Sequence, residues 1–199
     1  MGKLICIIGK SGSGKDTLYK NIISDPKLRL MPVTPYTTRP KRKEETDGED
    51  YHFVTLETMK AMEAAGEIIE KRVYHTVHGD WFYFTRKFEL QNEGKTAAII
   101  TTPAAFLKLA EVFGNKNLII VYLDTDDKTR LERSVNRESE QPTPNYQEVC
   151  RRFLADEKDF AFIKTEDWGS YCGYYRIDSG KSIDDCKRQF EEILRGVDG

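Results

Sequence analysis

The chain has few cysteines, and they are spread too widely along the sequence to act together. They are Cys6, Cys150, Cys172 and Cys186, with no Cys-x-x-Cys pair among them. A zinc site requires closer ligand spacing, and a disulfide framework is typical of smaller secreted chains. We therefore expect neither, and a reduced, cytoplasmic setting for the protein.

Long apolar runs and an excess of charge of either sign are also missing. No segment approaches the roughly 20 apolar residues of a membrane span, and the apolar run Leu4–Ile8 is too short for a signal peptide. The 31 basic and 33 acidic side chains give a formal net charge of −2. Because this balance argues against general nucleic-acid and membrane-surface binders, we expect neither kind of partner.

What the sequence does contain is a phosphate-binding motif with one unusual residue. The segment from Gly9 to Thr17 has the spacing Gly-x4-Gly-Lys-[Ser/Thr] of a P-loop, except that Asp16 replaces the hydroxyl residue. Glycines let successive backbone N–H groups point at an anion, and Lys15 would reach the β- and γ-phosphates of ATP. A plain Gly-rich turn is the alternative, but the apolar run before it and the helical segment after it favour phosphate binding. The residues expected to bind ATP are Gly9, Ser11, Gly12, Ser13, Gly14, Lys15, Asp16 and Thr17.

Asp16 decides how the chain would hold a metal ion. The hydroxyl residue of a P-loop ordinarily meets Mg²⁺, and a carboxylate is also a hard oxygen ligand. We therefore expect Asp16 to contact Mg²⁺, directly or through water, and we expect ATP and Mg²⁺ as the cofactors. The added negative charge beside a triphosphate is tolerable only with the metal bound.

Apolar runs that alternate with helical segments predict the fold class. Continuous apolar runs of this length are typical of strands buried on both faces of a parallel sheet, joined by right-handed crossovers. We predict a three-layer α/β/α fold of the P-loop NTPase type with a parallel central sheet. The predicted strands are Leu4–Ile8, Thr96–Thr101, Leu118–Leu123 and Tyr174–Ile177, the last of which precedes a closing helix over Ser182–Leu194.

Two segments interrupt this alternation. The first is β-rich, with a short helix capped by Thr55 and ended by Gly66, and with a hairpin around His78-Gly79-Asp80. The second is rich in arginine. We predict a P-loop core of residues 1–31, 93–131 and 153–199, an inserted lobe of residues 32–92, and a lid of residues 132–152.

The inserted lobe carries a cluster of cations that suits a second phosphate. Arg39 and Arg42 lie close together in the sequence and are followed by Glu45 and Tyr51. Guanidinium forks grip phosphate in a bidentate manner, and a tyrosine hydroxyl can donate a further hydrogen bond. Such a cluster is more often a solvated surface. Here, however, a protein with a phosphate loop requires an acceptor-side phosphate site, and this lobe supplies one.

At this point the sequence resembles the guanylate kinase family of nucleoside monophosphate kinases. The resemblance covers nearly the whole chain and is most specific across residues 37–85. The matching features are the loop Gly9–Thr17, the string Thr37-Thr38-Arg39-Pro40-Lys41-Arg42-(x2)-Glu45-(x2)-Gly48-x-Asp50-Tyr51-x-Phe53, the segment Gly66-Glu67-Ile68-Ile69-Glu70, and the aromatic strand after Gly79.

The resemblance implies roles for residues at both ends of the acceptor. Glu70 is similar to the carboxylate that pairs with guanine, which presents two neighbouring donors on one edge. A surface glutamate is the alternative. The residues expected around the acceptor are Arg39, Arg42, Glu45, Tyr51, Glu70, Tyr83, Thr85 and Thr102. Phosphoryl transfer depends on positioning and charge neutralisation, and the residues expected to catalyse it are Lys15, Arg39, Arg133, Arg137 and Arg152. For the lid arginines, an ordinary charged helix is the alternative.

The sequence departs from the family pattern near the acceptor's base. The strand before Pro103 ends in Thr101-Thr102 where the family has Asp-x-Asp, and Pro35 or Tyr36 stands in the place of a serine. The expected function is ATP-dependent phosphorylation of a nucleoside monophosphate, GMP or dGMP, by a monomer or homodimer. Two alternatives remain open: a kinase of a sugar phosphate such as ribose 1,5-bisphosphate, and a guanylate-kinase-like module that binds without catalysis.

Overall fold

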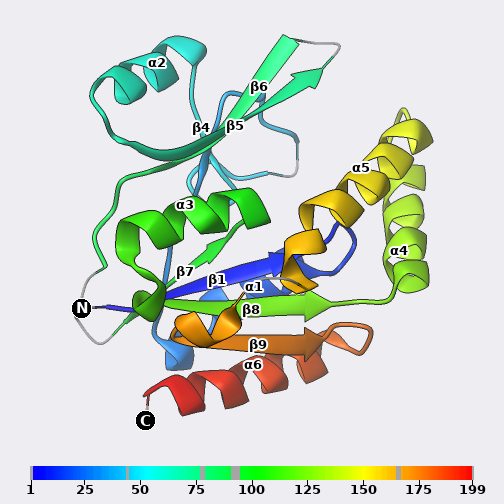
Figure 1. Ribbon diagram of the computed structural model, residues 1–199. Coiled ribbons are helices and arrows are strands. Elements are labelled where there is room, and N and C mark those ends of the chain that lie inside the picture. Colours follow the sequence, from blue (N-terminus) through cyan, green and yellow to red (C-terminus); the bar gives the residue numbers. More distant parts are fainter. Residues whose placement is uncertain (1, 44, 77–78, 91–94, 165–166, 199) are drawn as a thin grey trace.

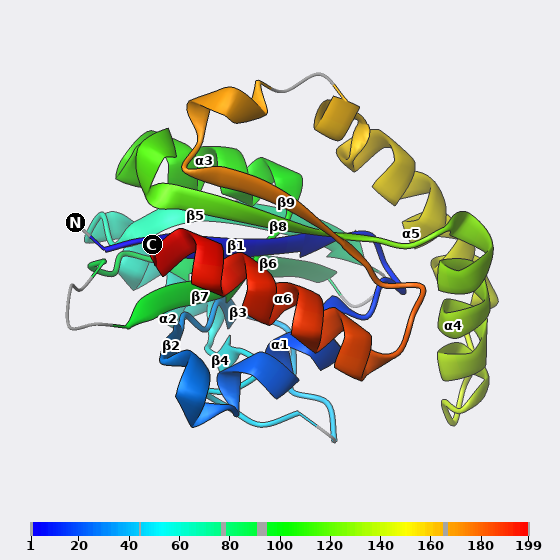
Figure 2. The ribbon, with the colours of Figure 1, turned by 90° about the horizontal axis from the view of Figure 1, so that it is seen from below.

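The computed structural model describes residues 2–43, 45–76, 79–90, 95–164 and 167–198. Its centre is a five-stranded parallel sheet with the strand order β2-β7-β1-β8-β9 (Figures 1 and 2). The strands are β1 (Leu4–Gly9), β2 (Leu30–Pro32), β7 (Thr96–Ile100), β8 (Leu118–Asp124) and β9 (Gly173–Asp178). All four predicted strands therefore became strands of the central sheet, with β9 at one edge and the added strand β2 at the other.

Helices cover both faces of this sheet and make the three-layer fold that the sequence predicts. Figure 2 shows α3 (Pro103–Phe113) on one side, and α1 (Lys15–Ile23) and α6 (Ile183–Asp198) on the other. Phe106 of α3 packs in the first of two apolar clusters, and Leu18 and Phe190 pack in the second. Short 3-10 segments complete the core at η1 (Pro26–Leu28), η2 (Asn115–Asn117), η3 (Ala161–Lys164) and η4 (Trp168–Ser170).

The inserted lobe has its own four-stranded sheet, of order β4-β3-β6-β5, with α2 (Leu56–Ala64) beside it. Its strands are β3 (Tyr36–Thr37), β4 (His52–Phe53), β5 (Ile68–Thr76) and β6 (Gly79–Arg86). Thr55 accepts a hydrogen bond from the Thr58 N–H at the start of α2, and Gly66 follows its end with φ +67°, as predicted. Of the predicted hairpin and its turn, Val77 and His78 lie outside the described residues.

This lobe has a small apolar core. Among its described residues, the buried apolar side chains are Met59 and Phe84. Tyr36 stacks on Phe84, with 5.2 Å between ring centroids. The remaining buried side chains of the lobe are polar or charged: Thr37, Arg39, Glu70 and Thr85. The lobe is therefore built around the groups expected to bind the acceptor.

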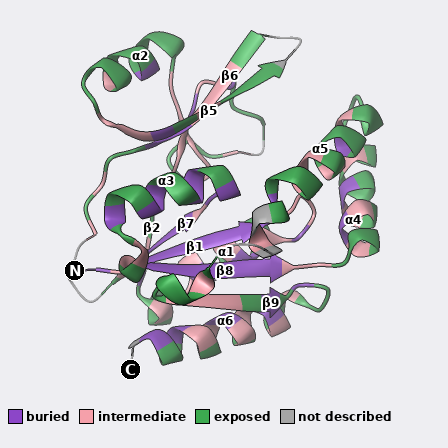
Figure 3. Cartoon of the chain, viewed as in Figure 1, coloured by how far each residue is buried: buried purple, intermediate pink, exposed green. Residues whose placement is uncertain are grey.

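Two further helices extend from the carboxyl end of the central sheet. They are α4 (Asp127–Ser139) and α5 (Tyr146–Asp159), called the lid helices below. Much of their surface is exposed, in contrast to the buried central strands (Figure 3). The division into core, inserted lobe and lid stays a prediction, and its boundary at residues 92 and 93 lies outside the described residues. No described helix is both long enough and apolar enough to cross a membrane.

Candidate active site

The glycine-rich loop joins the carboxyl end of β1 to the start of α1. Gly12 and Gly14 have φ of +80° and +84°, a left-handed conformation that side chains disfavour. A Cβ at Gly12 would also lie 2.3 Å from the backbone carbonyl oxygen of Arg130 in α4. Gly12 is therefore required both by its own conformation and by the close approach of a lid helix.

The loop fits a triphosphate. The hydroxyl of Ser13 is buried and has no hydrogen-bond partner in the described part of the chain. The start of α1 has no side-chain cap, so its first N–H groups and the helix dipole are available to an anion. Lys15 stands at this helix start with its side chain 22% exposed. A donor hydroxyl, free N–H groups and a cation thus converge where ATP phosphates are expected.

The Asp16 carboxylate is suited to bind a magnesium ion whose other ligands include phosphate oxygens. Its side chain is 67% exposed, and its Oδ2 lies 3.6 Å from Lys15 Nζ. Among the described residues no three acidic, histidine or cysteine side chains cluster as a metal site. Mg²⁺ usually takes one or two carboxylates and completes its shell with phosphate oxygens and water, so a single carboxylate beside bound phosphates is enough to hold it.

The lid helices contact the loop through a buried arginine that the sequence did not single out. The Arg130 side chain is fully buried, stacks 3.7 Å from the Phe153 ring centroid, and forms ion pairs with Asp127 and Glu157. Its Nη1 lies 3.7 Å from Asp156 Oδ2. An arginine surrounded by acidic residues in a helix is typical of a solvated face, so nothing in the sequence marked it.

The same acidic residues hold the phosphate loop. The backbone N–H of Ser11 donates to Asp156 Oδ2 at 2.7 Å, and Lys10 Nζ donates to Glu157 Oε1 at 2.6 Å. Asp156 and Glu157 therefore connect α5 to the loop, and Arg130 compensates their charge from α4. Hydrogen bonds and ion pairs thus connect the phosphate loop to the parts of both lid helices that lie next to it.

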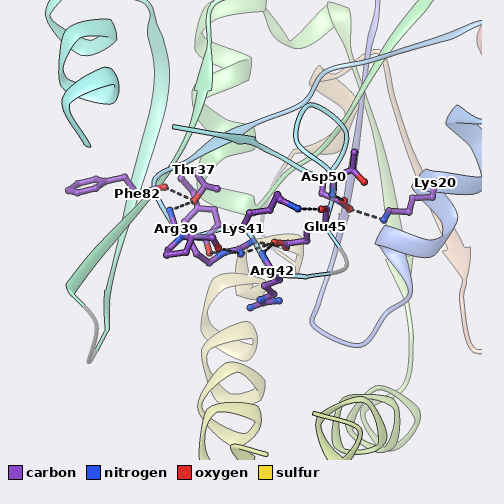
Figure 4. A network of polar contacts seen from close by, with 11 residues as sticks. Lys20, Thr37, Arg39, Lys41, Arg42, Glu45, Asp50 and Phe82 are labelled. Carbon is purple, nitrogen blue, oxygen red and sulfur yellow. Dashed lines mark hydrogen bonds and ion pairs between the residues drawn. The ribbon is translucent and has the colours of Figure 1, made fainter. Parts of the chain in front are cut away.

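In the inserted lobe, Arg39 is held in place by two predicted site residues, Tyr83 and Glu45, the second of which is labelled beside it in Figure 4. Its side chain is 4% exposed; its terminal nitrogens donate to Glu45 at 2.9 and 2.7 Å, and its Nε donates to Tyr83 Oη at 3.0 Å. Burial alone would lower the pKa of Arg39, but these hydrogen bonds more than offset it and raise the pKa. Glu45 thus serves as the partner of Arg39. Arg42 donates its backbone N–H to Glu45 and is exposed.

Tyr51 lies beside this arginine with its hydroxyl protonated. Its ring is 5.6 Å from that of Tyr83, edge to face, and the Arg39 guanidinium lies 5.6 Å from its centroid. Burial raises the pKa of Tyr51 to about 12, so its hydroxyl can donate a hydrogen bond to a phosphate at neutral pH. Arg39, Tyr51 and Tyr83 therefore form one group, as the acceptor-phosphate prediction requires.

The predicted base-reading residues also come together, with one addition. Glu70 is 5% exposed and accepts a 2.7 Å hydrogen bond from Thr85, its paired residue on β6. Arg72, two residues along β5, donates to Glu70 and to Thr102 of the core. Sequence reasoning missed Arg72, although strand alternation places residues 70 and 72 on one face.

The lid arginines divide into two groups. Arg133 donates to the Ser179 carbonyl at 3.0 Å, and its Nη1 would lie 3.9 Å from a Cβ placed on Gly14. The structure therefore brings Arg133 to the phosphate loop. Arg137 is exposed on α4. Arg152 pairs with Glu148 at 2.7 Å, where it shares that carboxylate with Arg151, and these hydrogen bonds lower the pKa of Glu148 to about 2.

A comparison with protein families tests to which family a chain with this phosphate loop and inserted lobe belongs. The family model described as guanylate kinase matches residues 1–167. The chain belongs to the guanylate kinase family. The family match confirms the resemblance seen in the sequence, and membership makes the protein a kinase of the nucleoside monophosphate type.

Individual guanylate kinases agree with this membership. The chain is 29% identical over 162 residues to a guanylate kinase of Paraburkholderia xenovorans (strain LB400), covering 80% of this chain and 68% of the relative. It is 40% identical over 93 residues to that of Aromatoleum aromaticum (strain DSM 19018 / LMG 30748 / EbN1), covering 46% and 43% of the two chains. The crystal structure of guanylate kinase from Anaplasma phagocytophilum has a similar fold, with a TM-score of 0.63 at 19% identity, covering 98% of this chain and 85% of that one.

Proposed function

We propose that this kinase transfers the γ-phosphoryl group of ATP to the phosphate of GMP or dGMP. The observation that carries the acceptor is Glu70, a buried carboxylate oriented by Thr85 on the sheet face that also presents Tyr83. Guanine offers two adjacent donors, N1–H and the exocyclic amine, and a carboxylate matches that pair. Adenine has no such pair of donors, so this residue favours a guanine nucleotide.

We assign the following roles in binding and transfer to the residues of the chain. Ser13, Lys15 and the N–H groups at the start of α1 bind the phosphates of ATP, while Arg39 and the Tyr51 hydroxyl orient the acceptor phosphate. Asp16 would hold Mg²⁺, which supplies charge neutralisation across the donor phosphates when bound. Arg133 lies next to the loop, where it would offset charge that develops during transfer. Arg137 and Arg152 lie toward the ends of α4 and α5 that are remote from Arg130 and Asp156, and they would reach the phosphates only after those ends move inward.

A coupled assay of ADP formation with each nucleoside monophosphate tests this proposal. We expect turnover with GMP and dGMP, and little with AMP, CMP or UMP. Turnover with ribose 1,5-bisphosphate but with no nucleotide would contradict the acceptor. Absence of both turnover and thermal stabilisation by ATP would point instead to a binding module that has lost catalysis.

An ion pair between core and lobe offers a second test. Lys20 of α1 contacts Asp50 of the inserted lobe at 2.7 Å (Figure 4). This contact draws the acceptor-phosphate residues toward the phosphate loop. We expect Lys20→Ala to raise the KM for GMP several-fold at low salt with little change in kcat. The difference from the wild type should fade at about 0.5 M salt, because exposed ion pairs are screened.

Lys187→Ala is the matched control for this prediction. Lys187 pairs with Asp25 at the same 2.7 Å, but both residues belong to the core. Its loss should leave the KM for GMP unchanged. If Lys20→Ala and Lys187→Ala have the same effect on KM, the contact between core and lobe has no role in acceptor binding.

A further inference from the structure

Arg72 is a cation of the acceptor site to which neither the family match nor the sequence pattern assigns a role. It lies on β5 opposite Tyr83 of β6, and its side chain is 22% exposed. Since alternate residues of a strand share a face, Arg72 stands on the same face as Glu70. It therefore lies between the carboxylate expected to read the base and the residues expected to bind the acceptor phosphate.

The hydrogen bonds of Arg72 fix its guanidinium and leave donors unused. Nε donates to Glu70 Oε2 at 3.1 Å, Nη2 to Glu70 Oε1 at 3.5 Å, and Nη1 to Thr102 Oγ1 at 2.8 Å. Each terminal nitrogen carries two N–H groups, so one N–H on Nη1 and one on Nη2 have no bond among these contacts. Thr102 is also the N-cap of α3, which anchors the guanidinium to the core.

Glu70 keeps acceptor capacity beside this cation. Its Oε1 accepts from Thr85 and, weakly, from Arg72, while Oε2 accepts only from Arg72 among the described residues. Each carboxylate oxygen can accept two hydrogen bonds. Glu70 and Arg72 together therefore present an acceptor and a pair of donors side by side.

This order of groups matches the polar atoms that follow one another around the six-membered ring of a 6-oxopurine and onto N7. Along guanine, the exocyclic amine and N1–H are donors, and the neighbouring O6 and N7 are acceptors. Arginine to O6 and N7 is the commonest specific contact with guanine, whereas adenine presents an amine donor in place of O6. The N–H donors of a guanidinium beside Glu70 would therefore face the acceptors O6 and N7 in guanine. In adenine they would face the amine, which is itself a donor.

We propose that Arg72 is a specificity-determining residue that donates to O6 and N7 of a 6-oxopurine acceptor while Glu70 accepts from its N1–H. This inference rests on the proposed function and refines it. In this arrangement both residues favour GMP and IMP, which share N1–H and O6, over AMP, which has neither group. Thr102, which stands in the place of a family carboxylate, acts as a positioning residue for Arg72.

The test is the steady-state kinetics of Arg72→Ala with GMP, IMP and AMP at saturating ATP. We expect the KM for GMP and IMP to rise about 10- to 100-fold, the range expected for one bidentate contact, while the KM for AMP and the kcat for GMP change less than threefold. Arg72→Lys keeps the charge beside Glu70 but loses the fork. It should retain the wild-type melting temperature and still lose most of the preference for GMP over AMP.

Lys71→Ala is the matched control on the same strand. Lys71 pairs with Glu63 at 2.5 Å on the opposite face of β5, so its loss should not change the KM for any purine. The inference is wrong if Arg72→Ala keeps the GMP-to-AMP preference within twofold of the wild type. It is also wrong if that variant turns over GMP faster, because Arg72 would then be blocking the base pocket.

Equilibrium binding separates this inference from the proposed function. Calorimetry of GMP and AMP with the wild type and Arg72→Ala, in the absence of ATP, measures base recognition without turnover. If the wild type binds GMP and discriminates through Arg72 but transfers no phosphoryl group, the proposed reaction fails and the inference stands. If the wild type turns over GMP with equal discrimination in both proteins, the reaction stands and the inference fails.

Discussion

Replacement of Lys15 by alanine should reduce the kcat for phosphoryl transfer by about 10²- to 10³-fold, the usual loss when one charge-stabilising donor is removed. Lys15 is positioned at the start of α1 by the left-handed Gly14 before it, and its side chain is only 22% exposed. Arg133 cannot take its place, because the Ser179 carbonyl holds its guanidinium at a different point beside the loop. Initial rates at saturating ATP and GMP measure this loss.

The control for Lys15→Ala is Lys116→Ala. Lys116 is exposed in η2, which precedes the amino end of β8, whereas the phosphate loop lies at the carboxyl end of the sheet. Its loss should leave kcat unchanged. Circular dichroism and melting temperature should match the wild type for both variants. A kcat for Lys15→Ala within tenfold of the wild type would show that the loop does not act on the transferred phosphate.

Replacement of Arg130 by methionine should lower the free energy of unfolding by about 3 kcal/mol, the low end of the range for breaking a buried ion pair. Methionine keeps most of the apolar contact with Phe153 but removes the charge that compensates Asp127, Asp156 and Glu157. Asp127 is 64% exposed and can regain water, whereas Asp156 is 15% exposed and cannot do so fully. Urea denaturation measures the loss.

The same variant should also weaken ATP binding, because Asp156 accepts the Ser11 N–H of the phosphate loop. We expect the Kd for ATP to rise about tenfold or more, with folded protein still present at 25 °C. The matched control is Arg188→Met, which removes an arginine from an exposed ion pair with Asp185 on α6. Equal losses of stability in the two variants would contradict the structural role of Arg130.

The fold could be predicted largely from local patterns. Continuous apolar runs such as Leu118–Leu123 require burial on both faces, and Thr55 and Gly66 mark the ends of α2 through local backbone chemistry. A strand of two residues such as β3 is too short to leave a pattern. The phosphate loop was predictable because its function depends on residues adjacent in sequence.

The polar connections between elements could not be predicted in this way. Arg130 is buried because α5 packs over it, and Arg72 is fixed by Thr102, which lies 30 residues away in the sequence. Both look like ordinary surface cations when their neighbours in sequence are considered alone. Glu45 was expected to contact the acceptor. In the structure its carboxylate instead accepts two hydrogen bonds from Arg39, and these depend on the fold of the lobe.

The small apolar core of the inserted lobe has a consequence for how the protein loses activity. Met59 and Phe84 are its buried apolar side chains among the described residues, whereas two large clusters stabilise the central sheet. Units with little buried apolar surface open at a lower free energy than the rest of the molecule. Amide hydrogens of β5 and β6 should therefore exchange with solvent through local unfolding, while those of β1 and β8 exchange only when the whole chain unfolds. Warming would then abolish recognition of the acceptor before the core melts.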